Sequence, residues 1–232
     1  MGVNCSELRT DWKLGIDAGM VLRAMGATPE AIRARQPRFV DLVETVVAKH
    51  QDCLRPSAAI REIAVREETP YGLMLENGVQ LHGPTLSRRL AGSECVVAVV
   101  GAIASDFERC AQARDLVHSL IVDALGTVAI TALTNSIFRE VRAMVRERRL
   151  NATHPLFPGM KGWELAAGQA QIFALVDGRA AGVSLNESFM MTPRKSVAFV
   201  IGIGAQVAEG PGACEDCQAA AHCRHQTPSY AC

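Results

Sequence analysis

The segment from Leu185 to Gly204 reads LNESFMMTPRKSVAFVIGIG, and it decides how the fold is interpreted. Its second half, Ser196–Ile203, is a mostly apolar run, which is the pattern of a strand covered on both faces. The residues before that run form a corner that ends near Pro193, because proline interrupts regular structure. This part of the chain therefore predicts a buried strand that follows a turn.

Three further segments are also expected to contain strands. Cys95–Val100 is another continuous apolar run, and Ile63–Val65 alternates with charged neighbours as a half-buried strand does. Leu73–Leu75 and Val79–Leu81 flank Glu76-Asn77-Gly78, in which Asn-Gly accepts the positive φ angles of a tight hairpin turn. These segments predict a twisted, mainly antiparallel sheet.

Helices are expected along the chain both before Ile63 and after Val100, because apolar residues recur at helical spacing there. Gly26 is placed to end the first helix, and Thr28-Pro29 suits the start of the second. Ser105–Glu108 has a capping-box pattern and starts a later helix, which we expect to stop at Gly126 before another begins. The expected helices cover residues 14–25, a stretch from 29, and residues 39–47, 105–126, 130–144 and 163–176.

The fold class is therefore α+β: a twisted, mainly antiparallel sheet with packed helices, over residues 1–208. After Gly204 the composition shifts to Gly, Ala, Cys and His, and residues 209–232 form a separate cysteine-rich tail. Hydrophobic residues make up 49% of the chain, which is ordinary for a globular protein.

Charge and apolar runs restrict the class of partner and the location. Lys plus Arg and Asp plus Glu both count 24, so the basic excess typical of nucleic-acid binders is missing. The stretch Met1–Gly15 has no secretory signal, and the run Cys95–Ala104 is too short to cross a bilayer. We expect a cytoplasmic protein with no nucleic acid and no membrane among its partners.

The corner segment also carries a family resemblance. Glu187-Ser188-Phe189-x-Met191-x-Pro193, followed by Ser196-Val197, resembles a signature of the activation domain of cobalamin-dependent methionine synthase. Pro158-Gly159-Met160 and the helix after it match a loop and helix of that family in order and spacing. The likeness covers roughly Pro155 to Gly204, and short stand-alone members also share an Ile-Asp…Val-Leu-Arg start, like Ile16 to Arg23 here, and a cysteine-rich end.

The resemblance implies a role in restoring cobalamin enzymes. The family's domain binds S-adenosylmethionine and presents its methyl group to cobalt while an electron donor reduces the metal, so methylation consumes the product of an unfavourable reduction. It implies an accessory or reductive-activation factor that works on the cobalamin of a corrinoid-binding protein or methyltransferase, in the reductive methylation of cob(II)alamin. The protein's contribution to such a reaction is positioning.

The same resemblance implies where S-adenosylmethionine would bind: His154, Pro158, Gly159, Met160, Glu187, Ser188 and Arg194. The sequence departs from the family ahead of this loop, where the arginine that binds the ligand carboxylate is replaced in Thr153-His154, and the loop tyrosine is Met160. A histidine does not replace a bidentate guanidinium, although Arg194 could supply the charge. Glu187 fits two roles: it could bind the ligand's ammonium or ribose, or it could serve the structure by capping a turn or pairing with Arg194 or Lys195. The alternative function is a non-enzymatic binding module of the same fold.

The tail contains Cys214-x2-Cys217-x5-Cys223, with His225 and Cys232 after it. Close spacing without a secretory signal favours a metal over a disulfide. An iron–sulfur cluster, expected as [4Fe-4S], would use these three cysteines and Cys232 or another fourth ligand, whereas a structural zinc could also use a histidine. We favour iron–sulfur, since a reductive activator needs one-electron chemistry that zinc lacks. A thiol-rich tail without metal is the remaining alternative.

Overall fold

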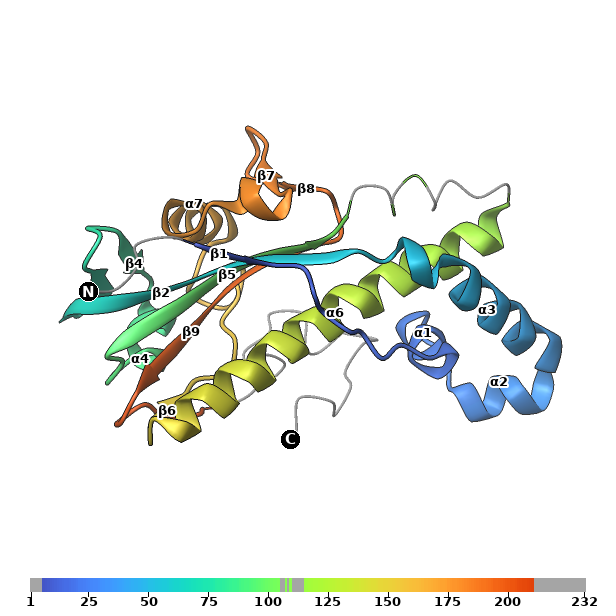
Figure 1. Ribbon diagram of the computed structural model, residues 1–232, viewed down its shortest axis with the longest axis horizontal. Coiled ribbons are helices and arrows are strands. Elements are labelled where there is room, and N and C mark those ends of the chain that lie inside the picture. Colours follow the sequence, from blue (N-terminus) through green and yellow to red (C-terminus); the bar gives the residue numbers. More distant parts are fainter. Residues whose placement is uncertain (1–5, 105–106, 108, 110–114, 211–232) are drawn as a thin grey trace.

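The computed structural model describes residues 6–104, 107, 109 and 115–210. In this part of the chain, seven strands form one antiparallel sheet in the order β4-β3-β2-β5-β9-β6, with β1 also paired to β2 (Figure 1). The strands are β1 Glu7–Arg9, β2 Pro56–Thr69, β3 Gly72–Leu75, β4 Gln80–His82, β5 Cys95–Ile103, β6 Asn151–Ala152 and β9 Ser196–Gly204. A small second sheet joins β7 Ser184–Leu185 to β8 Met191–Thr192. The predicted α+β fold with a mainly antiparallel sheet is confirmed.

The centre of the sheet is β5, which pairs with β2 on one side and β9 on the other. In the register, Ala59 lies opposite Val100, and Val99 lies opposite Phe199. Both apolar runs that predict two-faced burial are these central strands. The Asn77-Gly78 hairpin is confirmed as well, with β3 and β4 antiparallel and Gly78 at φ 82°.

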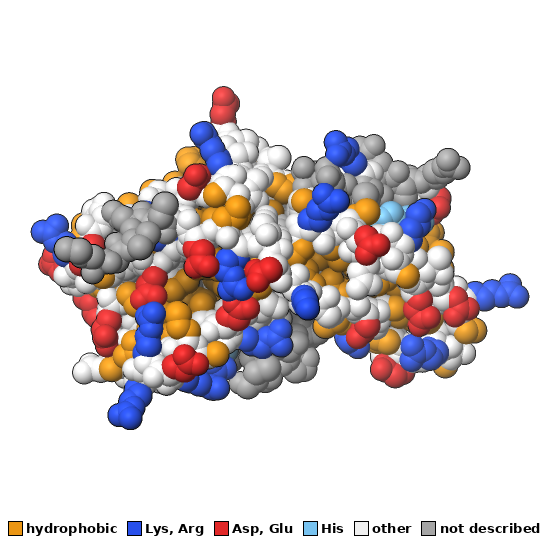
Figure 2. All heavy atoms as spheres, viewed as in Figure 1, with side chains coloured by type: hydrophobic (Ala, Val, Ile, Leu, Met, Phe, Trp, Pro, Cys, Tyr) orange, Lys and Arg blue, Asp and Glu red, His pale blue; other side chains and the backbone are white. Residues whose placement is uncertain are grey.

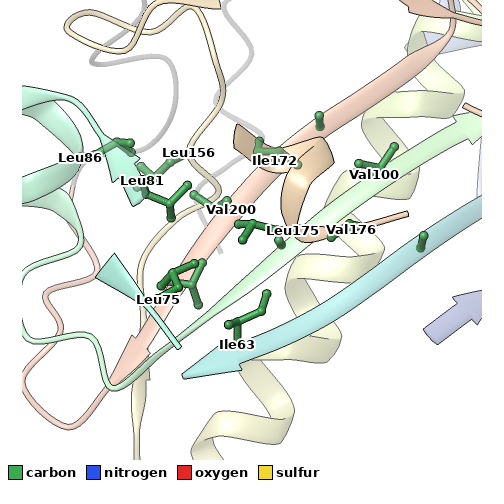
Figure 3. Packing of buried hydrophobic residues seen from close by; sticks show 14 of the residues in the cluster. Ile63, Leu75, Leu81, Leu86, Val100, Leu156, Ile172, Leu175, Val176 and Val200 are labelled. Atoms are coloured by element: carbon green, nitrogen blue, oxygen red, sulfur yellow. The ribbon is translucent and has the colours of Figure 1, made fainter. Parts of the chain in front are cut away.

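One face of the sheet is covered by α7 (Leu165–Leu175) and α4 (Pro84–Arg89). Alternate residues of the central strands point to this face, because side chains in a strand alternate between faces. Figure 3 shows the resulting cluster, in which Ile172 and Leu175 of α7 lie over Val100 and Val200. Trp163, just before α7, is also fully buried in it. The helix predicted at 163–176 is thus confirmed; it begins two residues later and ends one residue earlier than predicted.

The opposite face is crossed by α6, which runs from Leu116 to Glu147 as one helix (Figure 1). Its N-cap is Asp115, whose Oδ1 accepts a hydrogen bond of 2.8 Å from the His118 backbone N–H. The expected break at Gly126 is wrong. A Cβ on Gly126 would stand 2.6 Å from the Phe107 ring, so this glycine permits a close contact within the helix rather than ending it. The predicted capping box at 105–108 lies almost wholly outside the described residues.

Beyond the sheet, α6 packs against α1 (Ala18–Ala24) and α3 (Pro37–His50), and α2 (Pro29–Arg35) packs against α3. The apolar faces of these helices and of the first half of α6 form a separate cluster, which includes Val21, Val43 and Leu125. The boundaries predicted at Gly26 and Thr28-Pro29 are confirmed. On α6, however, Val117 and Leu120 are 44% and 53% exposed, although helical spacing places them on the apolar side.

Among the described helices, α6 alone has the length and apolar composition of a membrane span. In its most apolar window 44% of the residues are buried inside the fold. Its inward side chains, such as Leu133 and Ile137, pack against the sheet. This packing is that of a core helix.

Candidate functional site

The loop from Pro155 to Trp163 connects the sheet to α7. It is attached to the sheet by a bridge in which Leu156 and Val200 exchange hydrogen bonds of 2.9 and 3.0 Å. It then closes on itself, since the Gly159 N–H donates to the Trp163 carbonyl at 2.8 Å. Gly159 has φ 91° and is exposed, whereas Met160 is only 8% exposed and points into the core under α7.

This loop lies directly on α7 because of a glycine within that helix. A Cβ on Gly168 would stand 2.7 Å from Trp163 Nε1 and 2.9 Å from Pro158 Cβ. The Trp163 indole N–H donates to Gln171 Oε1 at 3.1 Å, which fixes the ring against the helix. The packing role of Gly168 was not recognised from the sequence, where it is only a residue of low helix propensity.

His154 lies on the other side of the sheet from α7. Its ring is 5.2 Å from the Phe138 ring of α6, measured between centroids. Its backbone N–H donates to the Glu209 carbonyl at 3.2 Å, and the Glu209 carboxylate pairs with Arg142 of α6 at 2.8 Å. The chain that leads into the cysteine tail is therefore held between His154 and α6.

Glu187 and Ser188 are exposed at the tip of the β7–β8 hairpin, which projects from the body in Figure 1. Asn186 shapes this tip, because its Oδ1 accepts hydrogen bonds of 2.9 Å from the N–H groups of Ser188 and Met190. This organising role of Asn186 was not recognised from sequence. Phe189 and Met190 are 39% and 55% exposed, so the tip presents apolar surface beside the Glu187 carboxylate.

Behind the hairpin, the segment between β8 and β9 is fixed to α6. Lys195 Nζ lies 2.9 Å from Asp123 Oδ1 and 3.0 Å from Thr127 Oγ1. Asp123 is thus the acidic partner of Lys195, one of the two partners considered for Glu187. Arg194 is exposed next to it. The predicted ligand residues therefore occupy three segments: His154 just before the loop, the loop residues Pro158–Met160, and the β7–β8 hairpin with the residues after it.

A large open groove, which sequence reasoning missed, lies elsewhere, between β1, β2 and the second half of α6. Its volume is about 1210 Å³. Figure 2 shows hydrophobic side chains gathered in a hollow with acidic and basic side chains around it. The lining residues are Ser6, Glu7, Arg9, Trp12, Ile60, Arg61, Glu62, Ile63, Ala64, Glu76, Asn77, Cys95, Val97, Ile137, Glu140, Val141 and Met144.

Two ion pairs border this groove. Arg9 pairs with Glu140 of α6 and lies over the Trp12 ring at 4.3 Å, and hydrogen bonding to Glu140 raises the pKa of Arg9. At the other end, Arg148 pairs with Glu62 at 3.0 Å. These pairs connect α6 and its C-cap residue Arg148 to β1 and β2.

Cys95 donates its thiol to Glu62 Oε1 at 3.3 Å inside the same groove. Burial, together with the negative charge of Glu62, raises the pKa of Cys95 to about 12. The thiolate is the reactive form of cysteine, so Cys95 is a protonated, unreactive thiol at neutral pH.

The proposed metal ligands Cys214, Cys217, Cys223 and Cys232 lie outside the described residues. Within residues 6–104 and 115–210, no group of three or more His, Cys, Asp or Glu side chains is placed to hold a metal ion. The tail remains a prediction.

No family model and no curated protein matches this chain. Among solved structures, the reactivation domain of MetH bound to AdoHcy superimposes with a TM-score of 0.57 at 15% sequence identity. The match covers 85% of this chain and 78% of that chain. The chain therefore has the fold of the MetH reactivation domain.

Proposed function

We propose that this protein is an accessory or reductive-activation factor for a cobalamin-dependent methyltransferase system. The observation that carries the proposal is the fold likeness to the MetH reactivation domain over most of the chain. The Glu187-to-Pro193 signature and the Pro158-Gly159 loop, both noted in the sequence, support it independently. Fold alone does not fix function, so the proposal depends on the ligand and partner tests below.

S-adenosylmethionine is the proposed methyl donor. The exposed carboxylate of Glu187 suits an ammonium or a ribose hydroxyl, and the exposed guanidinium of Arg194 suits a carboxylate. The exposed backbone at Gly159 leaves room for close approach. In this proposal Met160 does not contact the ligand directly; its buried side chain holds the loop in position.

Calorimetric titration with S-adenosylmethionine and with AdoHcy tests this step. Glu187→Ala and Arg194→Ala should each weaken binding more than about tenfold, because a charge-assisted hydrogen bond contributes about 1.5–3 kcal/mol. Glu44→Ala on α3 and Arg33→Ala on α2 are matched controls, since both side chains are exposed on the helical layer that α1, α2 and α3 form. Absence of heat and of any thermal shift at millimolar ligand would refute S-adenosylmethionine binding.

The partner in this proposal is a corrinoid-binding protein or cobalamin-dependent methyltransferase. An activator must bind the cob(II)alamin form of its partner better than the methylated form, since equal affinity shifts no equilibrium. Interferometry with a corrinoid protein prepared in the two states measures this difference. Equal affinities would count against activation.

We also propose that the tail carries an iron–sulfur cluster, with structural zinc as the alternative. Cysteine thiolates at this spacing suit either group, and only iron–sulfur supplies electron transfer. The absorbance spectrum and metal content of anaerobically purified protein distinguish the two. A colourless protein with one equivalent of zinc would give the tail a structural role.

A second candidate function is a binding module of the same fold without catalytic participation. The observation that favours it is Thr153-His154, which stands where the family has its carboxylate-binding arginine. Here the His154 ring packs on Phe138, so it is engaged in the fold. The titration above decides between the two functions: failure with both ligands favours the module.

A further inference from the structure

Two histidines far apart in the sequence meet end to end between the helical layer and α6. His50 is the last residue of α3, and His118 lies in the first turn of α6. Their Nε2 atoms are 3.0 Å apart, with ring centroids 5.2 Å apart and ring planes at 83°. His50 is 7% exposed and His118 is half-buried.

The contact itself requires an unprotonated ring nitrogen. At 3.0 Å one Nε2 donates its N–H and the other accepts, so the accepting ring is neutral. Burial lowers the pKa of His50, and the nearby His118 and Lys49 lower it further. Neutral imidazole is also the form that binds transition metals.

The spacing of the two nitrogens suits one metal ion. Zinc–imidazole bonds are about 2.0–2.1 Å long, so two nitrogen ligands of one ion lie about 2.9 Å apart at a right angle and about 3.3 Å apart at a tetrahedral angle. The observed 3.0 Å falls within that range. With the nitrogens 3.0 Å apart and the ring centroids 5.2 Å apart, the two rings meet nearly in line, so each ring has to tilt before both lone pairs point to one ion.

We infer that His50 and His118 form a binding site for a divalent transition-metal ion, of which Zn²⁺ is the natural probe. In the part of the chain that the structure describes, no third ligand is in place. Bound metal would join the end of α3 to the start of α6. The inference does not depend on the proposed function, and it uses none of the tail cysteines.

The experiment is a zinc titration of the full-length protein, followed by NMR of the histidine ring signals. The chain has six histidines, so the spectrum is simple, and His50→Gln and His118→Gln assign the two signals. We expect both signals to shift together with added Zn²⁺ and to return with a chelator. His82→Gln, at an exposed histidine of β4, should leave the paired shift unchanged.

Two results would overturn the inference. The first is uptake of zinc with no movement of the His50 and His118 signals, which would assign all binding to the tail. The second is a shift of the His50 signal that persists in His118→Gln, which would show that the two rings do not share an ion. If a variant does not fold, the titration is repeated with the His222→Gln/His225→Gln double variant, which lacks both tail histidines. Paired movement of two ring signals in that variant supports the site, and its absence refutes it.

Discussion

Replacing Leu133 by alanine tests whether α6 is packed as the core helix of the sheet. Leu133 is 0% exposed, and its Cδ2 lies 3.2 Å from where a Cβ on Gly101 would stand, so its tip fills the space that glycine leaves. The substitution removes about three carbon atoms at about 0.8 kcal/mol each, or roughly 2.4 kcal/mol. The cavity adds to this, and buried leucines typically lose about 2.7–5.0 kcal/mol. We expect a loss of about 3 kcal/mol.

Urea unfolding followed by circular dichroism measures the effect, with Leu120→Ala as the matched control. Leu120 lies on the same helix but is 53% exposed, so its loss should stay within about 0.5 kcal/mol. Helix propensity cancels, because leucine and alanine are both strong helix formers. The thermal midpoint of Leu133→Ala should fall by about 6–12 °C, at about 2–4 °C per kcal/mol for a chain of this size. Equal, small losses in the two variants would refute the packing.

Three further outcomes are expected from the described residues and the tail. Because its pKa is lowered on folding, His50 takes up a proton more readily in the unfolded chain, so stability in metal-free buffer should fall as pH drops through about 6.5. His50→Gln should flatten that slope in unfolding curves at pH 7.5 and 5.5; an unchanged slope would contradict the assignment. Cys95 should resist iodoacetamide at pH 8 in the native state but react in urea, as mass spectrometry can follow, and prompt native labelling would disprove its protonated state. Cys217→Ser should remove tail metal while leaving the unfolding midpoint unchanged, and a lowered midpoint would mean that the tail supports the fold.

Local sequence patterns predicted the elements whose structure depends on neighbours in the chain. The Asn77-Gly78 turn carries its own backbone preference, and the runs at Cys95 and Ser196 are apolar enough to require cover on both faces. The predicted hairpin and the two predicted buried strands are all present in the structure. Helix ends at Gly26 and Pro29 follow from the same local chemistry.

The errors and omissions arise where a distant residue decides. Gly126 has the local character of a helix end, yet it is a mid-helix contact required by the Phe107 ring. Leu120 has core spacing but lies where α6 has no covering element among the described residues. The groove and the His50–His118 contact join elements far apart in the chain, and periodicity carries no information about such pairs.

The length of α6 has a consequence for how this fold opens. At about 1.5 Å per residue the helix is about 48 Å long, and it supplies side chains to two clusters, one under the sheet and one under α1–α3. If α6 unfolds at one cluster, the helix is disturbed at the other cluster as well, and apolar surface becomes exposed in both. Amide protons near Val128 and Leu133, where the two clusters meet, should therefore exchange with solvent only when the whole chain unfolds, and the two halves should melt as one cooperative unit.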